Sequence, residues 1–334
     1  MCQRLPGGQR NAAVCRGDVL SRRVPVDLAH SVRDRLKVMA RQSGEPFADV
    51  LVRYGLERML YRLSCSEWRG RFTLKGAYLF SLWVEHPHRV TRDVDLAGRG
   101  RPDAAEVERI FRSLCDMAVE PDGLAFVAES VRTEAIRRAD EYHGVRVRLM
   151  AKLKRARIPL QVDVGLGDAV EPQPEDVQLP VMLPEMPAPK LKAYTRYSVV
   201  AEKLHAIVEI GYETSRVKDY FDLHEMARQF EFDGDTLVIS IRATFGRRKT
   251  GMPAATPAGL QDEFARDQVK LTMWRVFLRK TRPAGAGPAL ADVLIALRAF
   301  LLPPLSAART GTASHRCWIP GKGWQAKAWR SPSD

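Results

Sequence analysis

Two carboxylates placed two positions apart, Asp93 and Asp95, are the side chains of this sequence best suited to hold a metal ion. They lie in the run Arg92-Asp93-Val94-Asp95-Leu96, whose alternation of polar and apolar residues predicts a short strand. Alternate residues of a strand leave the same face, so both carboxylates would lie together while Val94 and Leu96 point to the other face. Neighbouring carboxylates repel unless a cation lies between them, and Mg²⁺ binds one or two carboxylates together with phosphate oxygens. The pair therefore predicts a Mg²⁺ or Mn²⁺ site, although a lone pair of this kind also occurs on solvated strands.

A turn that could bind phosphate, Lys75-Gly76-Ala77, precedes the two carboxylates. It follows the predicted strand 71–74 and opens a predicted helix over 76–83. Backbone N–H groups at the start of a helix can receive phosphate oxygens, and a glycine lets the phosphate approach closely. The alternative is an ordinary strand-to-helix turn.

A third carboxylate, Asp163, lies between Val162 and Val164 in another alternating segment. An acidic residue on an otherwise apolar strand needs a partner, which would be either a metal ion or one of the many arginines. Two carboxylates that bridge two metal ions, a third that completes the ion activating a hydroxyl, and a backbone cradle for a triphosphate are the parts of a two-metal phosphoryl-transfer site. The order of the motifs fits such a site.

The elements that must position these residues belong to two predicted regions. In the first, apolar residues at helical spacing predict two amphipathic helices over 24–64, and the ladder of Arg53, Glu57, Arg58 and Arg62 is interpreted as a solvated helix face. A helix is expected over 104–117, and strands over 143–149 and 158–164 are expected to form a hairpin. Six prolines in residues 171–189 exclude regular structure there and indicate a crossing to the second region.

The second region is predicted to be helical. Helices are expected over 198–210, 215–230, 235–245, 257–264, 269–280 and 289–301, the last ending at Pro303 and Pro304. Lys203 would project from the flank of the first of these helices, and Asp219 and Asp222 would share one face of the second.

These elements predict an α/β (α+β) fold: a mixed sheet with flanking helices, followed by a helical lobe. The expected domains are a disordered basic N-terminus (1–23), the helices and sheet (24–188), the helical lobe (189–305) and a disordered basic tail (306–334) that contains several tryptophans.

Composition limits the class of protein. The chain has 334 residues, is 45% hydrophobic and carries a formal net charge of +13. Much of this excess lies at the two ends, so the body is only mildly basic, and nucleic-acid binding must be argued from the site. Five scattered cysteines disfavour a disulfide framework or a zinc site, and neither a membrane span nor a secretion signal is recognised, so we expect a cytoplasmic protein that does not contact the membrane.

Three stretches in order resemble the AbiEii/AbiGii toxin family of the nucleotidyltransferase superfamily. The resemblance extends from about residue 24 to residue 300 and implies a nucleotidyltransferase-like fold. Its motifs are residues 71–80 with 89–96, residues 158–168, and residues 201–204 with 215–223.

The resemblance implies transfer of a nucleotide from an NTP, with Mg²⁺, to a hydroxyl acceptor, notably RNA such as tRNA 3′ ends, by a bacterial toxin of an abortive-infection type whose antitoxin is encoded nearby. It implies that Asp93, Asp95 and Asp163 hold the metal and that Lys203 contacts the nucleotide phosphates, with Asp219 and Asp222 ordering the surrounding network. The residues expected to add contacts to the nucleotide are Lys75, Gly76, Ala77, Arg92, Arg216 and Lys218. Two alternatives remain from the residues alone: a metal-dependent nuclease and a non-catalytic nucleotide-binding module.

Overall fold

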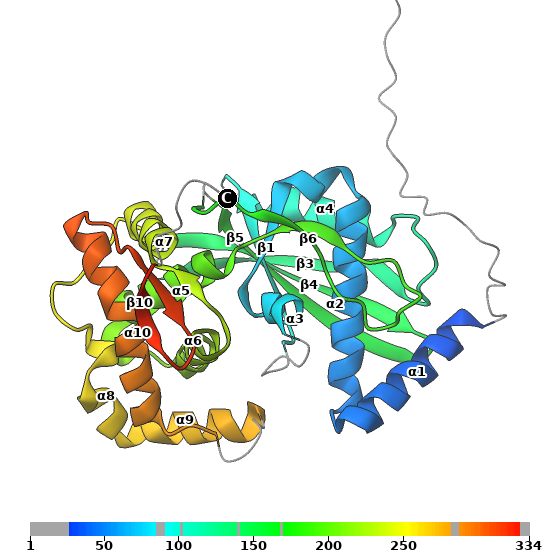
Figure 1. The fold of residues 1–334 in the computed structure, drawn as a ribbon. Coiled ribbons are helices and arrows are strands. Elements are labelled where there is room, and N and C mark those ends of the chain that lie inside the picture. Colours follow the sequence, from blue (N-terminus) through cyan, green and yellow to red (C-terminus); the bar gives the residue numbers. More distant parts are fainter. Residues whose placement is uncertain are drawn as a thin grey trace, which may run out of the picture. The chain divides into compact units, whose positions relative to one another are not determined.

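The computed structural model describes residues 27–84, 91–100, 103–138, 141–167, 170–281 and 287–327 (Figure 1). The predictions for residues 1–23 and for the proline-containing loop at 85–90 lie outside the described residues. The helices are α1 (Leu28–Ser43), α2 (Phe47–Cys65), α3 (Phe80–Trp83), α4 (Ala104–Cys115), α5 (Arg196–Ile210), α6 (Val217–Gln229), α7 (Gly234–Arg247), α8 (Asp262–Arg266), α9 (Gln268–Thr281) and α10 (Leu290–Thr310). Short 3₁₀ helices are η1 (Glu67–Arg71), η2 (Gly76–Leu79), η3 (Gly211–Glu213) and η4 (Ala258–Leu260).

The described strands form two sheets. They are β1 (Phe72–Lys75), β2 (Val94–Arg99), β3 (Ala125–Arg138), β4 (Glu141–Leu153), β5 (Ala156–Gly167), β6 (Glu175–Gln178), β7 (Lys190–Ala193), β8 (Phe232–Asp233), β9 (Arg316–Ile319) and β10 (Gly323–Ala326). The larger sheet has the order β3-β4-β5-β2-β1-β7-β6, and the smaller one has the order β10-β9-β8. Because β3, β4 and β5 pair antiparallel while β1 and β7 pair parallel, the larger sheet is mixed, and the predicted α/β class is confirmed.

The chain divides into two compact units, each assembled from separate stretches of sequence. Unit 1 comprises the described parts of Met1–Phe72, Arg101–Gly165 and Gln178–Leu191, and unit 2 comprises those of Thr73–Gly100, Leu166–Val177 and Lys192–Asp334. The units are therefore discontinuous, whereas the prediction treated 24–188 and 189–305 as contiguous domains. Thr73–Gly100, which carries the Lys75-Gly76 turn and the Asp93 and Asp95 pair, groups with the C-terminal helices.

In unit 1 the predicted hairpin is present as β4 and β5, with Val147 opposite Val162 and Arg146 opposite Asp163. The sequence analysis missed β3, which pairs with the other edge of β4, and α4 packs on both strands (Figure 1). Val145, Val147, Val162 and Val164 are buried, so the period-two pattern does mark the covered face of these strands.

The ladder on α2 is buried, and its interpretation as a solvated face is wrong for three of its four residues. Glu57, Arg58 and Arg62 are 1%, 0% and 5% exposed. Glu57 accepts a hydrogen bond from the backbone N–H of Met182 at 2.7 Å, and Arg58 donates to the carbonyl of Pro187 at 2.9 Å. Residues 178–191 thus contact Glu57 and Arg58, while Arg62 pairs with Asp122. The spacing of charges along one helix cannot reveal these partners.

Two proline-containing segments also differ from prediction. α10 continues through Pro303 and Pro304 to Thr310, whereas the prediction ended this helix at the prolines. Packing of its apolar side against α6 and α7 compensates for the backbone hydrogen bonds that the two prolines cannot donate. Strand β6 lies inside the segment 171–189, which was expected to be irregular. Among the described residues α10 alone is long and apolar enough to meet the criterion for a membrane span, a criterion that core helices also meet. Its side chains Leu297, Phe300 and Leu301 are fully buried within unit 2.

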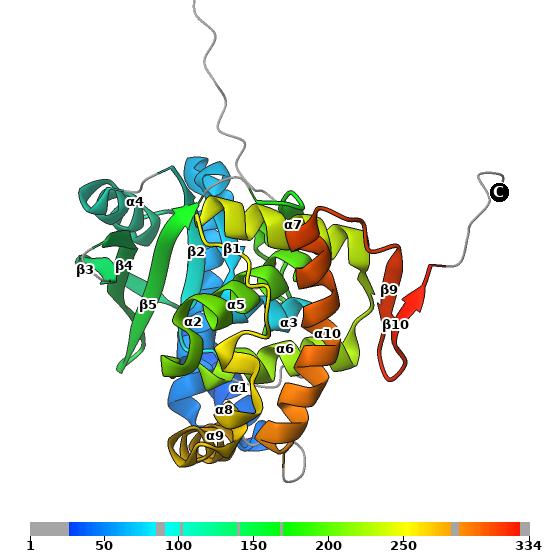
Figure 2. The same ribbon diagram turned by 90° about the vertical axis from the view of Figure 1, so that its left-hand side faces the viewer.

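Residues 306–327, the described part of the segment predicted to be a disordered tail, form the end of α10 and the hairpin of β9 and β10 (Figure 2). Two indole N–H groups anchor the hairpin: Trp318 donates to the carbonyl of Ala227 at 2.7 Å, and Trp324 donates to that of Phe300 at 3.0 Å. The strands are four residues long and depend on these distant acceptors, so no periodicity marks them in the sequence.

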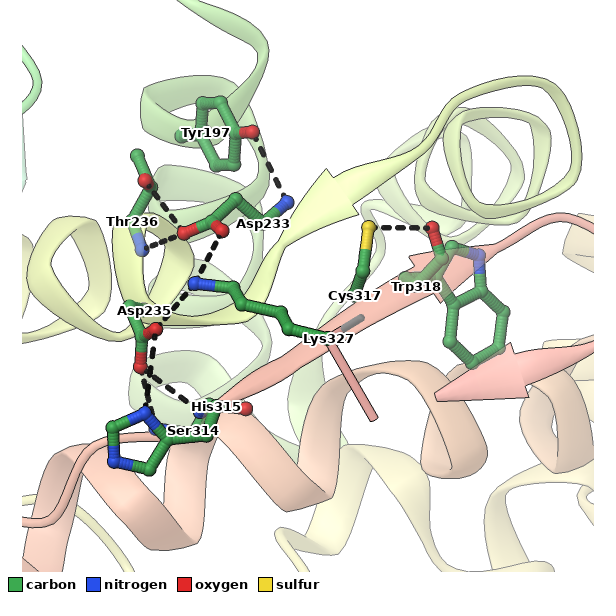
Figure 3. Close-up of polar contacts among 9 residues, drawn as sticks. All are labelled: Tyr197, Asp233, Asp235, Thr236, Ser314, His315, Cys317, Trp318 and Lys327. Carbon is green, nitrogen blue, oxygen red and sulfur yellow. Dashed lines mark hydrogen bonds and ion pairs between the residues drawn. The ribbon is translucent and has the colours of Figure 1, made fainter. Parts of the chain in front are cut away.

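A charged clasp closes the same hairpin (Figure 3). The Lys327 ammonium lies 2.6 Å from Asp233 and 2.5 Å from Asp235, two residues at the start of α7. Burial acts to raise the pKa of Asp235, but hydrogen bonds from Lys327 and from the backbone of His315 and Ser314 outweigh it and lower that pKa to about 2.

We predict that Asp235→Asn lowers the free energy of unfolding by about 1–2 kcal/mol at pH 7, since the lowered pKa is a stabilisation of the charged form. The pKa is lower in the folded state, so the stabilisation is present above about pH 4 and disappears as the pH falls from about 4 to 2. Urea unfolding of both proteins across this range measures the difference. Asp262→Asn, an exposed carboxylate on α8, is the control and should change stability by less than about 0.5 kcal/mol. A stability difference that is constant with pH would contradict the role of the charge.

Candidate active site

The turn after β1 and the acidic strand β2 are in direct contact within unit 2. Gly76 has a φ of +73°, a conformation that favours glycine, and a Cβ at this position would lie 2.1 Å from Oδ2 of Asp95. The Asp95 carboxylate therefore packs against the main chain of the turn. The predicted helix 76–83 is one 3₁₀ turn, η2, followed by the single turn α3.

The acidic strand has the predicted alternation. Val94 and Leu96 are buried, whereas Asp93 and Asp95 are half-buried. β2 begins at Val94, so Asp93 lies just before the strand, where the Thr91 hydroxyl is 3.3 Å from one of its carboxylate oxygens. Two accessible carboxylates match the donor set of Mg²⁺, which completes its shell with water and phosphate oxygens. Among the described residues, three or more potential ligands do not gather at one point.

A buried ion cluster joins α5 to α6 in the same unit. The Lys203 ammonium donates to Asp219 at 2.6 Å and to Asp222 at 2.8 Å, and both carboxylates are at most 1% exposed. Burial acts to raise the pKa of Asp219, but the charges of Lys203 and Arg216 outweigh it and lower that pKa. Lys203 was expected on an open helix flank; it is instead buried between the two aspartates that were expected to order the network.

Arg216, the residue before α6, links this cluster to the acidic strand. Its Nε donates to Asp219 at 2.5 Å, and its side chain remains one-third exposed. Burial acts to lower the pKa of Arg216, but the negative charges of Asp219, Asp95 and Glu202 outweigh it and raise that pKa. The guanidinium is thus within electrostatic range of Asp95, while Lys218 is exposed on α6 and Arg92 is exposed before β2.

A second ion pair beside the turn was missed by the sequence analysis. Glu202, next to Lys203 on α5, accepts a hydrogen bond from Arg247 of α7 at 2.9 Å. Burial acts to raise the pKa of Glu202, but the charges of Lys75, Arg247 and Arg248 outweigh it and lower that pKa. The acidic residue adjoining Lys203 was a signal in the sequence, but nothing marked the cations at the end of α7.

Asp163 lies in unit 1 and has an arginine partner. Nε and Nη2 of Arg146, directly opposite on β4, donate to the two oxygens of Asp163 at 2.9 and 2.7 Å. The sequence left an arginine or a metal ion as its partner, and the arginine is present. A role for Asp163 in binding metal stays a prediction.

The sequence matches the model of the family described as nucleotidyl transferase AbiEii toxin, type IV toxin–antitoxin system, over residues 58–296. The chain belongs to the AbiEii family. The matched residues contain every motif discussed above, and they establish this protein as a nucleotidyltransferase of a toxin family, for which an antitoxin partner is implied.

Two crystal structures from Helicobacter pylori are similar to this AbiEii-family chain at 13% sequence identity. One is that of JHP933, with a TM-score of 0.44; the match covers 79% of this chain and 92% of the JHP933 chain. The other is described as a candidate nucleotidyltransferase, with a TM-score of 0.42 and coverages of 78% and 95%. No match to the sequence is found among curated proteins.

We predict that Gly76→Ala lowers nucleotide transfer at least about tenfold. The added methyl group would overlap the Asp95 carboxylate, and alanine is strained at a left-handed φ, so the turn would have to move away from Asp95. Initial rates with a labelled NTP measure the effect. Gly70→Ala is the matched control, since a Cβ there meets no atom within 4 Å and the backbone is not left-handed. Full activity of Gly76→Ala would show that the close contact is dispensable.

Proposed function

We propose that this AbiEii-family enzyme transfers a nucleotide from an NTP, with Mg²⁺ or Mn²⁺, to a hydroxyl of an RNA acceptor such as a tRNA 3′ end. The observation that carries the proposal is the packing of the Asp95 carboxylate against Gly76, with the charge of Arg216 in range. This arrangement puts carboxylates for a cation beside a turn and a guanidinium suited to phosphate.

The residues take the following parts. Asp93 and Asp95 would hold the metal, which supplies Lewis-acid stabilisation of the triphosphate, and Asp163 would be the third ligand that the resemblance to the family implies. Lys75, the backbone of Gly76 and Ala77, the exposed cations Arg92 and Lys218, and the partly exposed Arg216 would bind and orient the phosphates.

Lys203 acts mainly through its neighbours. Its ammonium balances Asp219 and Asp222, so that Asp219 stays charged and holds the Arg216 guanidinium by Nε. Both terminal nitrogens of Arg216 can then meet phosphate oxygens. The acceptor hydroxyl would give its proton to solvent water as its oxygen forms a bond to the α-phosphorus. The bond between the α-phosphorus and the oxygen that bridges it to the β-phosphorus breaks, and that oxygen leaves with the released pyrophosphate.

The proposal extends to the cellular setting. The protein would act in the bacterial cytoplasm, where NTPs and RNA are present, and an antitoxin encoded nearby would oppose it. Support for this part comes from the family, which is that of type IV toxin–antitoxin systems.

The direct test uses purified protein, each of the four α-labelled NTPs, Mg²⁺ and total cellular RNA. We expect label to enter RNA, and we expect Asp93→Asn and Asp95→Asn to reduce transfer at least about 100-fold, because each removes charge that fixes the metal. Asp34→Asn, an exposed carboxylate on α1, is the control. Transfer that persists in both active-site variants would refute the assigned metal site, and RNA breakdown without any NTP would indicate a nuclease instead.

A second pair of variants tests Asp163. Asp163→Asn and Arg146→Gln remove the same ion pair, but only the first removes the carboxylate. We expect at least about a 100-fold loss of transfer and a higher Mg²⁺ requirement in Asp163→Asn, and a loss within about tenfold in Arg146→Gln. Equal losses in the two variants would mean that Asp163 serves only to pair Arg146.

A further inference from the structure

Lys270, on α9, is a buried lysine whose acceptor is a main-chain oxygen rather than a carboxylate. It is 6% exposed, and its ammonium donates to the carbonyl of Thr214 at 3.0 Å. The ammonium also lies 5.4 Å from the ring centroids of Tyr212 and Phe264, within the range of cation–π attraction. Its backbone is fixed as well, since Asp267 accepts the N–H of Lys270 at 3.0 Å.

Burying the charge of Lys270 in this environment does not by itself stabilise the folded protein. Removing an ammonium from water costs several kcal/mol. One carbonyl, two ring faces and the attraction of the partly exposed Asp267 carboxylate, whose pKa the Lys270 charge helps to lower, offset that cost only in part. An unbranched apolar side chain would fill the same space without the desolvation cost. The distinctive contribution of the ammonium is therefore its bond to Thr214.

Thr214 connects this bond to the candidate active site. It is 1% exposed and lies between η3 and α6. Its hydroxyl accepts the backbone N–H of Arg216 at 3.1 Å, and Arg216 in turn donates to Asp219 at 2.5 Å. A continuous series of direct hydrogen bonds thus runs from Lys270 through Thr214 and Arg216 to the Lys203 cluster.

We propose that Lys270 is a positioning residue that holds residues 214–216 so that Arg216 meets the phosphates of the NTP, an inference that rests on the proposed function. The Lys270 ammonium fixes the Thr214 carbonyl, and the Thr214 hydroxyl fixes the start of α6. The Arg216 guanidinium is thereby held beside Asp95 before the substrate binds, which removes an ordering cost from binding.

The same loop offers a matched control. The Tyr212 hydroxyl donates to Asp267 at 2.9 Å, which also joins the loop to the start of α9. Tyr212→Phe removes this bond but keeps the ring that faces Lys270 and leaves Thr214 untouched.

The experiment measures the Kd of each Mg²⁺–NTP, and of Mg²⁺–tripolyphosphate, by calorimetric titration of the full chain. For the NTP that binds best to the unaltered protein, we expect Lys270→Met to raise the Kd at least about tenfold and Tyr212→Phe to leave it within about twofold. Lys270→Arg keeps a charged donor and should bind within about threefold of the unaltered protein. Lys270→Leu is a second apolar variant should Lys270→Met fail to fold, and thermal unfolding verifies the fold of each protein.

A double-mutant cycle tests whether Lys270 acts through Arg216. Arg216→Gln should weaken binding at least about tenfold, and adding Lys270→Met should weaken it no more than about twofold further. Unchanged affinity in the folded Lys270 variants, or losses that multiply in the double variant, would overturn the inference and leave the proposed function standing. If the unaltered protein binds neither an NTP nor tripolyphosphate, the proposed function fails and the inference falls with it.

Discussion

The close approach of the Asp95 carboxylate to the main chain at Gly76 is the constraint on which the arrangement of unit 2 depends. It exists because residue 76 has no side chain and adopts a left-handed φ, so the strand that carries Asp93 and Asp95 can lie against the turn that carries Lys75. Parallel pairing of β1 with β7, with Thr73 opposite Lys192, brings the start of the C-terminal helices to the same turn. The acidic strand and the turn that carries Lys75 are thus brought together by one small residue.

Charge compensation is the second organising feature of unit 2. Buried charges are unfavourable unless each has a close partner, and here the partners come from different helices: Lys203 with Asp219 and Asp222, and Glu202 with Arg247. Breaking one pair would leave an uncompensated charge in the interior. The pairs therefore tie α5, α6 and α7 into one electrostatic unit, and the partly exposed Arg216 is the member that extends toward Asp95.

Sequence patterns were informative where local chemistry determines structure. The β4–β5 hairpin, the alternation around Asp95 and the mixed α/β class follow from period-two patterns, and the quoted motifs indicated the enzyme family, which the match over residues 58–296 confirms. The errors concern residues whose surroundings come from distant parts of the chain. Nothing near Arg58 indicates that residues 178–191 cover it, and nothing near Trp318 indicates that Ala227 accepts its indole N–H. The roles assigned to the site residues remain predictions.

The discontinuity of unit 2 affects when the enzyme can become complete during its own synthesis. Thr73–Gly100 leaves the ribosome long before Lys192–Asp334, and chains fold from the N-terminus as they emerge. Until Arg216 and α6 follow, Asp95 lacks the counter-charge of Arg216, and until β9 pairs with β8, with Trp318 opposite Phe232, the small sheet of unit 2 is incomplete. Synthesis in this order therefore completes the candidate site only after α6 has emerged, well beyond the middle of the chain.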